Sequence, residues 1–228
     1  DFQRLSDFSS DLAHELRTPI SNLLTQTQVT LSAKRDTETY RDTLASNAEE
    51  LQRLGRMVSD MLFLAKTERG VDLPSKERFS AAAEVCALLE FYEAVAEEKN
   101  INLSTHGDGE IQGDRLMFRR ALSNLLSNAL RHTPERGEVQ VAVAREEGAV
   151  RVTVENAGNE IDPKDLPRLF DRFYRADPAR THPGSDGSGL GLSITKAIVE
   201  AHGGHVSARS EQGKTRFSLA FPVEPNGH

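Results

Sequence analysis

The sequence lacks tryptophan, has few aromatic residues and contains a single cysteine. Aromatic side chains make up 6% of the 228 residues, and with only Cys86 available no disulfide can form within the chain. A lone cysteine is typical of a reducing compartment. Because Cys86 lies in the apolar run AAAEVCALLEF, we predict that it is a small core residue.

Positive charge and long apolar runs are also scarce. The formal net charge is −7, which argues against a general nucleic-acid binder, because such a protein needs basic surface to neutralise phosphates. No stretch is long and apolar enough to cross a bilayer or to act as a signal peptide. The seven histidines and one cysteine show no metal-ligand spacing. Since the chain opens in a helical pattern with DFQRLSDF, we expect a fragment of a longer protein.

Residues 1–68 predict two long helices. Apolar residues recur every three or four positions, the spacing of packed amphipathic helices, and the polar break KRDTET separates two such series. This pattern predicts an antiparallel helical hairpin. A lone hairpin leaves one apolar stripe exposed, and pairing two hairpins into a four-helix bundle covers it, so we expect a homodimer.

The rest of the chain mixes helices and strands. The Gly- and Pro-containing segment at 69–78 predicts a linker, followed by a domain at 79–223 and a tail at 224–228. We predict helices at 80–98, 114–132 and 190–201, with Asp114 as an N-cap. Five segments predict strands: INLST, EVQVAVAR, AVRVTVEN, HVSARS and TRFSLAFP, of which EVQVAVAR and AVRVTVEN form an antiparallel hairpin. The fold class is α+β in layers.

The segment FSSDLAHELRTP could carry a nucleophile. His14 falls between two apolar seam positions, so helical geometry turns it towards solvent, and Thr18 shares its face. An exposed imidazole can attack through a ring nitrogen while the carboxylate of Glu15 takes the other proton. Pro19 removes a helix hydrogen bond beside this pair, which favours a bend there. A surface histidine beside a proline kink explains the segment about equally well.

The segment NLLSNALRHTP places polar side chains on one helix face. Asn124 and Asn128 are four residues apart, and Arg131 lies one turn further along. Asparagine is a poor former of helix interiors, whereas its amide oxygen is a hard ligand that suits Mg²⁺. Arg131 could meet a phosphate. The alternative is an ordinary solvated face.

Two further segments predict close approach of a ligand to the backbone. VENAGNEI ends a strand in Asn156 and Gly158, a pattern that most often marks only a turn. GSDGSGLGLSITKAIVEAHGG leads from Gly187, Gly189 and Gly191 straight into a helix, whose N-terminus favours anions. It is neither a Walker loop, because no GK[ST] follows, nor a Rossmann fingerprint. The preceding ADPARTHPGSDGS is either a mobile lid over a phosphate or a disordered loop.

In this order, the segments resemble the H, N, G1, F and G2 boxes of sensor histidine kinases, with LFDRFYRAD as the F box and GKTRFSLAFP as the closing region. The resemblance covers nearly the whole chain, and the sequence is most similar to the heavy-metal subgroup, such as copper or silver sensors. It implies a dimerisation and phosphotransfer hairpin in a dimeric four-helix bundle. An α/β-sandwich ATP-binding domain of the histidine kinase and gyrase type would follow.

The resemblance also implies roles for single residues. His14 would be the phosphoacceptor, Glu15 its base, and Thr18 the residue that positions water for dephosphorylation of the partner. Asn128, helped by Asn124, would hold Mg²⁺. The residues implied to bind ATP are Asn124, Asn128, Arg131, His132, Asn156, Gly158, Ile161, Arg175, Gly187, Gly189, Leu190, Gly191 and Leu192.

Three positions depart from the family pattern. Asn156 stands where the G1 box usually has Asp, Glu160 where it usually has a second Gly, and His132 where the N box often has Tyr. An amide oxygen can still accept a hydrogen bond from the adenine amino group, so we expect ATP binding to survive.

The expected function is ATP-dependent phosphorylation of His14, then transfer to an aspartate of a response-regulator receiver domain, with phosphatase activity toward that regulator. We expect a cytoplasmic fragment of a bacterial inner-membrane sensor, attached to the membrane only through upstream segments. The rival interpretations are an ATP-driven dimer clamp and a non-enzymatic dimerisation scaffold. The first has no need of His14, and the second predicts losses among the Asn and Gly positions.

Overall fold

The computed structural model describes residues 2–70, 74–176 and 189–223. The chain divides into two compact units, residues 1–62 and 63–228, and each unit is described by itself. The division into a hairpin at 1–68, a linker at 69–78, a domain at 79–223 and a tail stays a prediction.

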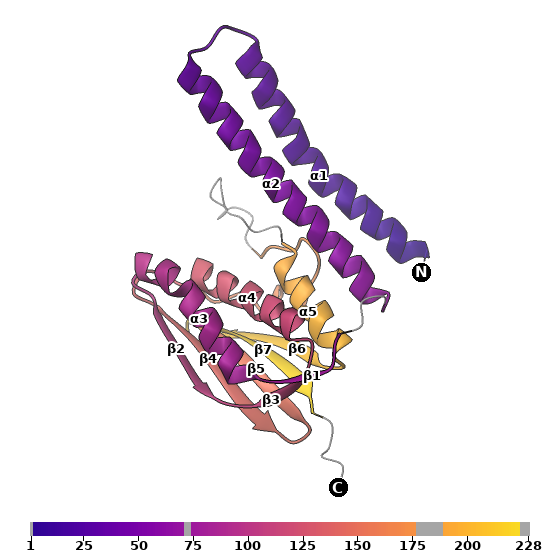
Figure 1. The fold of residues 1–228 in the computed structure, drawn as a ribbon, viewed down its shortest axis with the longest axis vertical. Coiled ribbons are helices and arrows are strands. Elements are labelled where there is room, and N and C mark those ends of the chain that lie inside the picture. The colour runs from indigo at the N-terminus through magenta and orange to yellow at the C-terminus, as the bar shows by residue number, and fades with distance from the viewer. Residues whose placement is uncertain (1, 71–73, 177–188, 224–228) are drawn as a thin grey trace. The chain divides into compact units, whose positions relative to one another are not determined.

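The first unit is a helical hairpin, as predicted (Figure 1). Helix α1 spans Phe2–Leu31 and continues through Pro19, and helix α2 spans Thr37–Glu68, so the end of α2 from Phe63 onward belongs to the second unit. Two polar contacts join the helices. The Asn47 amide nitrogen donates to the Thr27 hydroxyl at 3.0 Å, and the hydroxyls of Thr30 and Thr43 lie 3.3 Å apart.

Apolar side chains on both helices of the hairpin are exposed. On each helix, several of these residues follow one another at intervals of four or seven positions. Residues at such intervals share one helix face. The exposed fractions reach 70%. The two sets are Ile20, Leu24 and Leu31, and Leu44, Leu51, Val58 and Leu62. The predicted exposed apolar stripe is therefore present on the hairpin.

The second unit contains a five-stranded sheet in the order β2-β4-β5-β7-β6. Strand β2 pairs parallel to β4, and the other neighbours are antiparallel. The predicted hairpin is β4 and β5, joined by a turn at Glu147–Gly148. The strands are β2 (Asn102–Gly107), β4 (Glu138–Glu146), β5 (Ala149–Ala157), β6 (His205–Glu211) and β7 (Lys214–Pro222).

Three helices cover one face of this sheet (Figure 1): α3 (Ala81–Glu98), α4 (Arg115–His132) and α5 (Gly191–Ala201). The strands alternate buried and partly exposed residues, the pattern of a sheet with one face against a core. The core beneath the helices includes Phe118, Leu122, Leu125, Leu126, Ile194, Ile198, Val141, Val143, Val152, Val154, Leu219 and Phe221. The predicted α+β layered fold is confirmed.

Two short strands were not predicted from the sequence. Strand β1 (Glu77–Ser80) pairs antiparallel with β3 (Glu110–Gly113). Each has four residues, too few to show a clear alternation. Ser80 at the end of β1 is also the N-cap of α3, because its hydroxyl accepts from the Ala83 amide at 3.1 Å.

The prediction that Cys86 is a core residue is wrong, because Cys86 is exposed. Its neighbour Val85 faces the core, and one step of about 100° around the helix carries residue 86 away from it. The buried polar residue on α3 is Glu84, which is 5% exposed. Arg115 on α4 compensates this charge, with its Nε 2.6 Å from a Glu84 oxygen.

The start of α4 is joined to the end of α5. Asp114 is the N-cap, as predicted, since its carboxylate accepts from the Met117 amide at 2.9 Å. The Asp114 amide donates to His202 Nε2 at 2.9 Å, and His202 Nδ1 lies 2.7 Å from the Ile198 carbonyl oxygen. Burial alone would raise the pKa of Asp114, but hydrogen bonds from Met117 and Ser75 outweigh it and lower that pKa.

Candidate nucleotide and phosphoacceptor site

The polar face predicted on α4 is present and touches α5. Asn124 and Asn128 are both partly exposed, so their amides can be reached from solvent. The Asn124 amide nitrogen donates to the Gly191 carbonyl oxygen at 3.1 Å. This bond joins the N box to the first residue of α5 and leaves the Asn124 amide oxygen for a ligand.

A cavity of about 470 Å³ lies between the end of α4 and the loop after β5. It brings together three predicted site residues, Arg131, His132 and Gly158. A Cβ at position 158 would lie only 2.9 Å from the His132 carbonyl oxygen, so a glycine permits this close approach. The cavity is also lined by Thr133, Pro134 and Asn159, which the sequence analysis missed although they directly adjoin predicted residues.

The electrostatic environment of the cavity favours anions. Burial, followed by the positive charges of Arg131 and Lys99, lowers the pKa of His132, so its ring is neutral near pH 7. Arg131 is exposed and lines the cavity, so it places a positive charge at the cavity wall.

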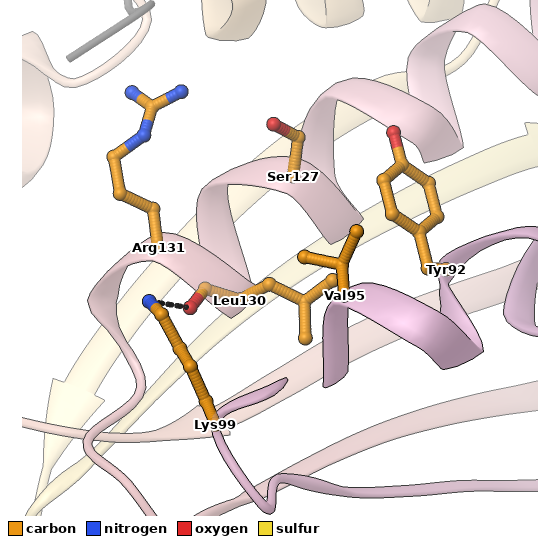
Figure 2. Close-up of a pocket in the computed structure, with 6 residues that line it drawn as sticks. All are labelled: Tyr92, Val95, Lys99, Ser127, Leu130 and Arg131. Carbon is orange, nitrogen blue, oxygen red and sulfur yellow. Dashed lines mark hydrogen bonds between the residues drawn. The ribbon is translucent and has the colours of Figure 1, made fainter. Parts of the chain in front are cut away.

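A second, smaller hollow of about 210 Å³ shares Arg131 with the first (Figure 2). Lys99 reaches across it from the end of α3 and donates to the Leu130 carbonyl oxygen at 3.0 Å. A cation on a terminal carbonyl stabilises a helix C-terminus. Lys99 thus supports the turn of α4 that presents Arg131 and His132.

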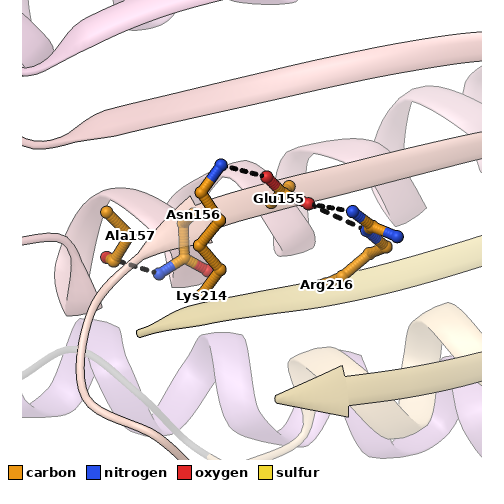
Figure 3. A network of polar contacts seen from close by, with 5 residues as sticks. All are labelled: Glu155, Asn156, Ala157, Lys214 and Arg216. Carbon is orange, nitrogen blue, oxygen red and sulfur yellow. Dashed lines mark hydrogen bonds and ion pairs between the residues drawn. The ribbon is translucent and has the colours of Figure 1, made fainter. Parts of the chain in front are cut away.

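Asn156 lies at the end of β5 and is 3% exposed. Its amide nitrogen donates to the Ala157 carbonyl oxygen at 3.1 Å, which leaves the amide oxygen to accept from a ligand (Figure 3). Its neighbour Glu155 binds Lys214 Nζ and Arg216 Nε, each at 2.8 Å. Burial raises the pKa of Glu155, but the bonds from Lys214 and Arg216 outweigh it, so the pKa is lowered. These contacts fix β5 to β7 beside Asn156.

The F box meets the glycine segment at one point. The Phe173 amide donates to the Gly189 carbonyl oxygen at 3.0 Å. Gly189 has φ +71°, and a Cβ there would lie 2.8 Å from the Phe173 Cα. Phe173 itself has φ +59°, a conformation that costs most non-glycine residues free energy. Glycine at 189 is therefore required both by its backbone angle and by this contact.

The remaining predicted residues differ in burial. Leu190 is fully buried, Gly191 begins α5, and Leu192, Ile161 and Arg175 are partly exposed. Gly187 lies outside the described residues.

The predicted phosphoacceptor segment lies on α1. His14, Glu15 and Thr18 are all exposed, and the exposure of His14 and Thr18 agrees with the prediction from helical periodicity. They belong to the first compact unit, and the nucleotide-binding candidates belong to the second.

Two family models match the chain along most of its length. Residues 4–70 match the His Kinase A (phospho-acceptor) domain, and residues 113–225 match the histidine kinase-, DNA gyrase B- and HSP90-like ATPase. The chain belongs to the sensor histidine kinases. The resemblance drawn from the ordered motifs is confirmed.

Individual relatives agree with this assignment. The sensor histidine kinase CusS of Escherichia coli (strain K12) is 50% identical over 223 residues, which are 97% of this chain and 46% of that protein. The probable sensor kinase SilS of Salmonella typhimurium is 44% identical over 226 residues, 97% of this chain and 45% of SilS. The chain thus spans about half the length of these curated relatives.

A solved structure shares the fold. The structure of histidine kinase ThkA in complex with the response regulator protein TrrA superposes with a TM-score of 0.78 at 24% identity, covering 99% of this chain and 65% of that chain. Among the described residues of our chain, no helix has both the length and the apolar character needed to cross a membrane.

Two amide side chains of this histidine kinase chain could hold a metal ion that binds mainly through the phosphates of a nucleotide. Within residues 2–70, 74–176 and 189–223, no group of three or more His, Cys, Asp or Glu side chains could hold a metal ion. Mg²⁺ commonly takes few protein ligands and binds mainly through substrate phosphates. The amide oxygens of Asn124 and Asn128 fit that role.

Proposed function

We propose that this chain transfers the γ-phosphoryl group of ATP to His14. The observation that supports this most is the cavity walled by Arg131, His132 and Gly158, with the buried Asn156 at the end of the neighbouring strand. The same chain exposes His14 on a helix. An anion-binding cavity and an exposed nucleophile are the two parts that phosphoryl transfer needs.

In the proposed reaction, a ring nitrogen of His14 attacks the γ-phosphorus. The bond between the γ-phosphorus and the bridging oxygen breaks, and ADP leaves with that electron pair. Glu15 accepts the proton from the other ring nitrogen, which keeps the imidazole nucleophilic. Arg131 and Arg175 offset the negative charge that spreads over the transferred group.

The nucleotide is held by residues of several elements. We propose that the Asn156 amide oxygen accepts from the adenine amino group, that Gly158 and Ile161 lie against the base, and that His132 packs beside the nucleotide. Leu190, Gly191 and Leu192 would shape the phosphate end, with Gly187 and Gly189 before them. Asn128 and Asn124 would hold Mg²⁺, which when bound shields the phosphate charges.

The phosphohistidine then passes its phosphoryl group to an aspartate of a response-regulator receiver domain. In the opposing phosphatase reaction, Thr18 positions the water that dephosphorylates that regulator. The exposed apolar faces of α1 and α2 favour a homodimer, because a second hairpin would cover them. We propose that the chain is the cytoplasmic part of a bacterial inner-membrane sensor. In support, the chain matches 46% of the length of the sensor histidine kinase CusS.

The test is incubation of the chain with γ-labelled ATP, with and without Mg²⁺. We expect Mg²⁺-dependent label that is lost in acid and kept in base, as a phosphoramidate is. His14→Gln should abolish the label and leave the affinity for an ATP analogue within a few-fold, because His14 lies on the hairpin. Labelling of the variant at the parental rate would show that His14 is not the acceptor. Nucleotide binding without label in the parent would favour the dimer clamp.

A further inference from the structure

Glu160 departs from the family pattern and has a defined partner in the structure. It stands where the G1 box usually has a second glycine, in the loop that follows β5. Its carboxylate oxygen Oε1 accepts from the Gly213 amide at 3.0 Å. Gly213, with φ +71°, forms the turn between β6 and β7. Glu160 therefore ties the G1 loop to a turn more than 50 residues further along the chain.

The same turn holds the loop at two other points. The Gly213 carbonyl oxygen accepts from the Gly158 amide at 2.9 Å, so this glycine uses both of its backbone polar groups on the G1 loop. The Ile161 amide donates to the Ser210 hydroxyl oxygen at 2.9 Å. Two of these three hydrogen bonds use a side chain, that of Glu160 or that of Ser210. The Glu160 bond has a carboxylate acceptor, and such charge-assisted hydrogen bonds are the stronger type.

These bonds act on the wall of the nucleotide cavity. Gly158 and Asn159 line it, and they follow directly on Ala157, where β5 ends its pairing with β7, and precede the residues held by the β6–β7 turn. A glycine at position 160 would leave the loop without the side-chain bond and with more backbone freedom in the unbound state. Ordering the loop in advance lowers the entropic cost of binding a ligand.

We propose that Glu160 is a positioning residue for the nucleotide: by fixing residues 158–161 to the β6–β7 turn, it holds the adenine side of the cavity in its binding geometry. This rests on the proposed ATP site. Glu160 does not touch the reacting atoms. Its effect is on the affinity for nucleotide, and the rate of phosphoryl transfer at saturating ATP does not depend on it.

The experiment compares Glu160→Ala, Glu160→Gly and Glu160→Gln in the full 228-residue chain. Calorimetry with a non-hydrolysable ATP analogue and Mg²⁺ gives the affinity, and His14 labelling gives kcat and KM. Hydrogen exchange reports on the Gly213 amide, which Glu160 contacts directly. Glu147→Ala is the matched control, since Glu147 is an exposed glutamate in the turn at Glu147–Gly148, between β4 and β5.

We expect Glu160→Ala and Glu160→Gly to weaken nucleotide binding about three- to tenfold, because the loop that Glu160 orders in advance must then be ordered on binding. KM should rise by the same factor, kcat should stay within about twofold, and the Gly213 amide should exchange faster. Glu160→Gln keeps an acceptor, so it should bind within about twofold of the parent. Glu147→Ala should keep the parental affinity for nucleotide.

Three results would overturn the proposal: parental affinity in both Ala and Gly variants, unchanged exchange at Gly213, or a loss of kcat with constant KM. A parallel titration of Asn156→Leu distinguishes an error in the role of Glu160 from an error in the proposed ATP site. If Asn156→Leu binds weakly while the Glu160 variants bind like the parent, only the positioning role is wrong. If Asn156→Leu also binds like the parent, the nucleotide site itself lies elsewhere.

Discussion

Asn156 is the residue that we propose contacts the adenine base, and its individual atoms determine which base it can bind. An aspartate offers two equivalent acceptors, whereas an asparagine offers one acceptor and one donor. The Asn156 amide nitrogen is engaged by the Ala157 carbonyl oxygen, so the oxygen is the atom left for a ligand. This orientation suits an amino group such as that of adenine and disfavours the carbonyl of guanine.

We expect Asn156→Asp to change ATP affinity by less than about tenfold, because charge assistance and the desolvation of a buried carboxylate oppose each other. Asn156→Leu should bind more weakly, since it leaves the adenine amino group unpaired. GTP should bind poorly to the parent. A flip of the Asn156 amide would offer its NH₂ group to guanine, but it would break the hydrogen bond to Ala157. We therefore expect Asn156 to keep its preference for ATP over GTP.

Calorimetric titration of ATP and GTP against the parent and both variants checks this expectation. Equal affinities for ATP and GTP in the parent would contradict the orientation of Asn156 given by its bond to Ala157.

At the scale of elements, the junction of α4 with the end of α5 links the two helices that border the nucleotide region. Asp114 caps α4 with its carboxylate, while its amide is held by His202 at the end of α5. His202 Nδ1 faces the Ile198 carbonyl oxygen, so the neutral ring donates there and accepts at Nε2. Ser75 adds two bonds to the same carboxylate, from its amide and its hydroxyl.

Replacing this N-cap should cost stability in a pH-dependent way. Asp114→Ala should lower the free energy of unfolding by about 1 kcal/mol at pH 7, the usual cost of losing such a cap. The folded-state pKa of Asp114 is lowered. Its ionised form therefore stabilises the fold above the unfolded value of about 3.9, and this contribution is lost as the pH falls through the folded value.

Urea unfolding of the parent and Asp114→Ala between pH 3 and pH 7 measures this, with Glu90→Ala on the exposed side of α3 as the control. The stability difference should narrow below about pH 4. A difference that stays constant with pH would show that the Asp114 charge does not contribute.

At the scale of the whole molecule, the hairpin exposes apolar faces that the proposed homodimer would cover. Leu24 and Leu51 are 57% and 59% exposed and belong to the two sets of apolar residues spaced by four and seven. Such a regular stripe is typical of a helix that packs against another helix. A second copy of the hairpin has the same stripe, so a symmetric bundle would cover both stripes.

Introducing charge into that stripe should dissociate the dimer. Leu24→Glu combined with Leu51→Glu would bury unpaired charges in the bundle, at a cost that exceeds the gain from association. Sedimentation equilibrium should give the parent at twice the chain mass of 25.2 kDa and the variant at that mass. Gln26→Glu, at an exposed polar position of α1, is the control and should remain dimeric. A parent that sediments as a monomer would contradict the proposal.

Local patterns in the sequence were enough to predict most of the helices and strands. The helix of residues 114–132 was predicted with its cap, because Asp114 precedes an apolar face repeating every three or four residues. The β4–β5 hairpin was predicted from two alternating runs separated by a short turn. By contrast, β1 and β3 were missed, because four residues carry too little periodicity, and their pairing joins segments about 30 residues apart.

The sequence by itself determined the order of the motifs, the exposure of His14 and the family, since each depends on residue types at fixed local spacing. Only the tertiary structure decided which residues share a cavity, because Arg131, Gly158 and Asn159 meet through packing between α4 and the end of β5. It also decided that Glu84, and not Cys86, is buried on α3. Arg115 approaches from α4 to compensate that charge, and such a partner is fixed by the packing of helices that no local pattern describes.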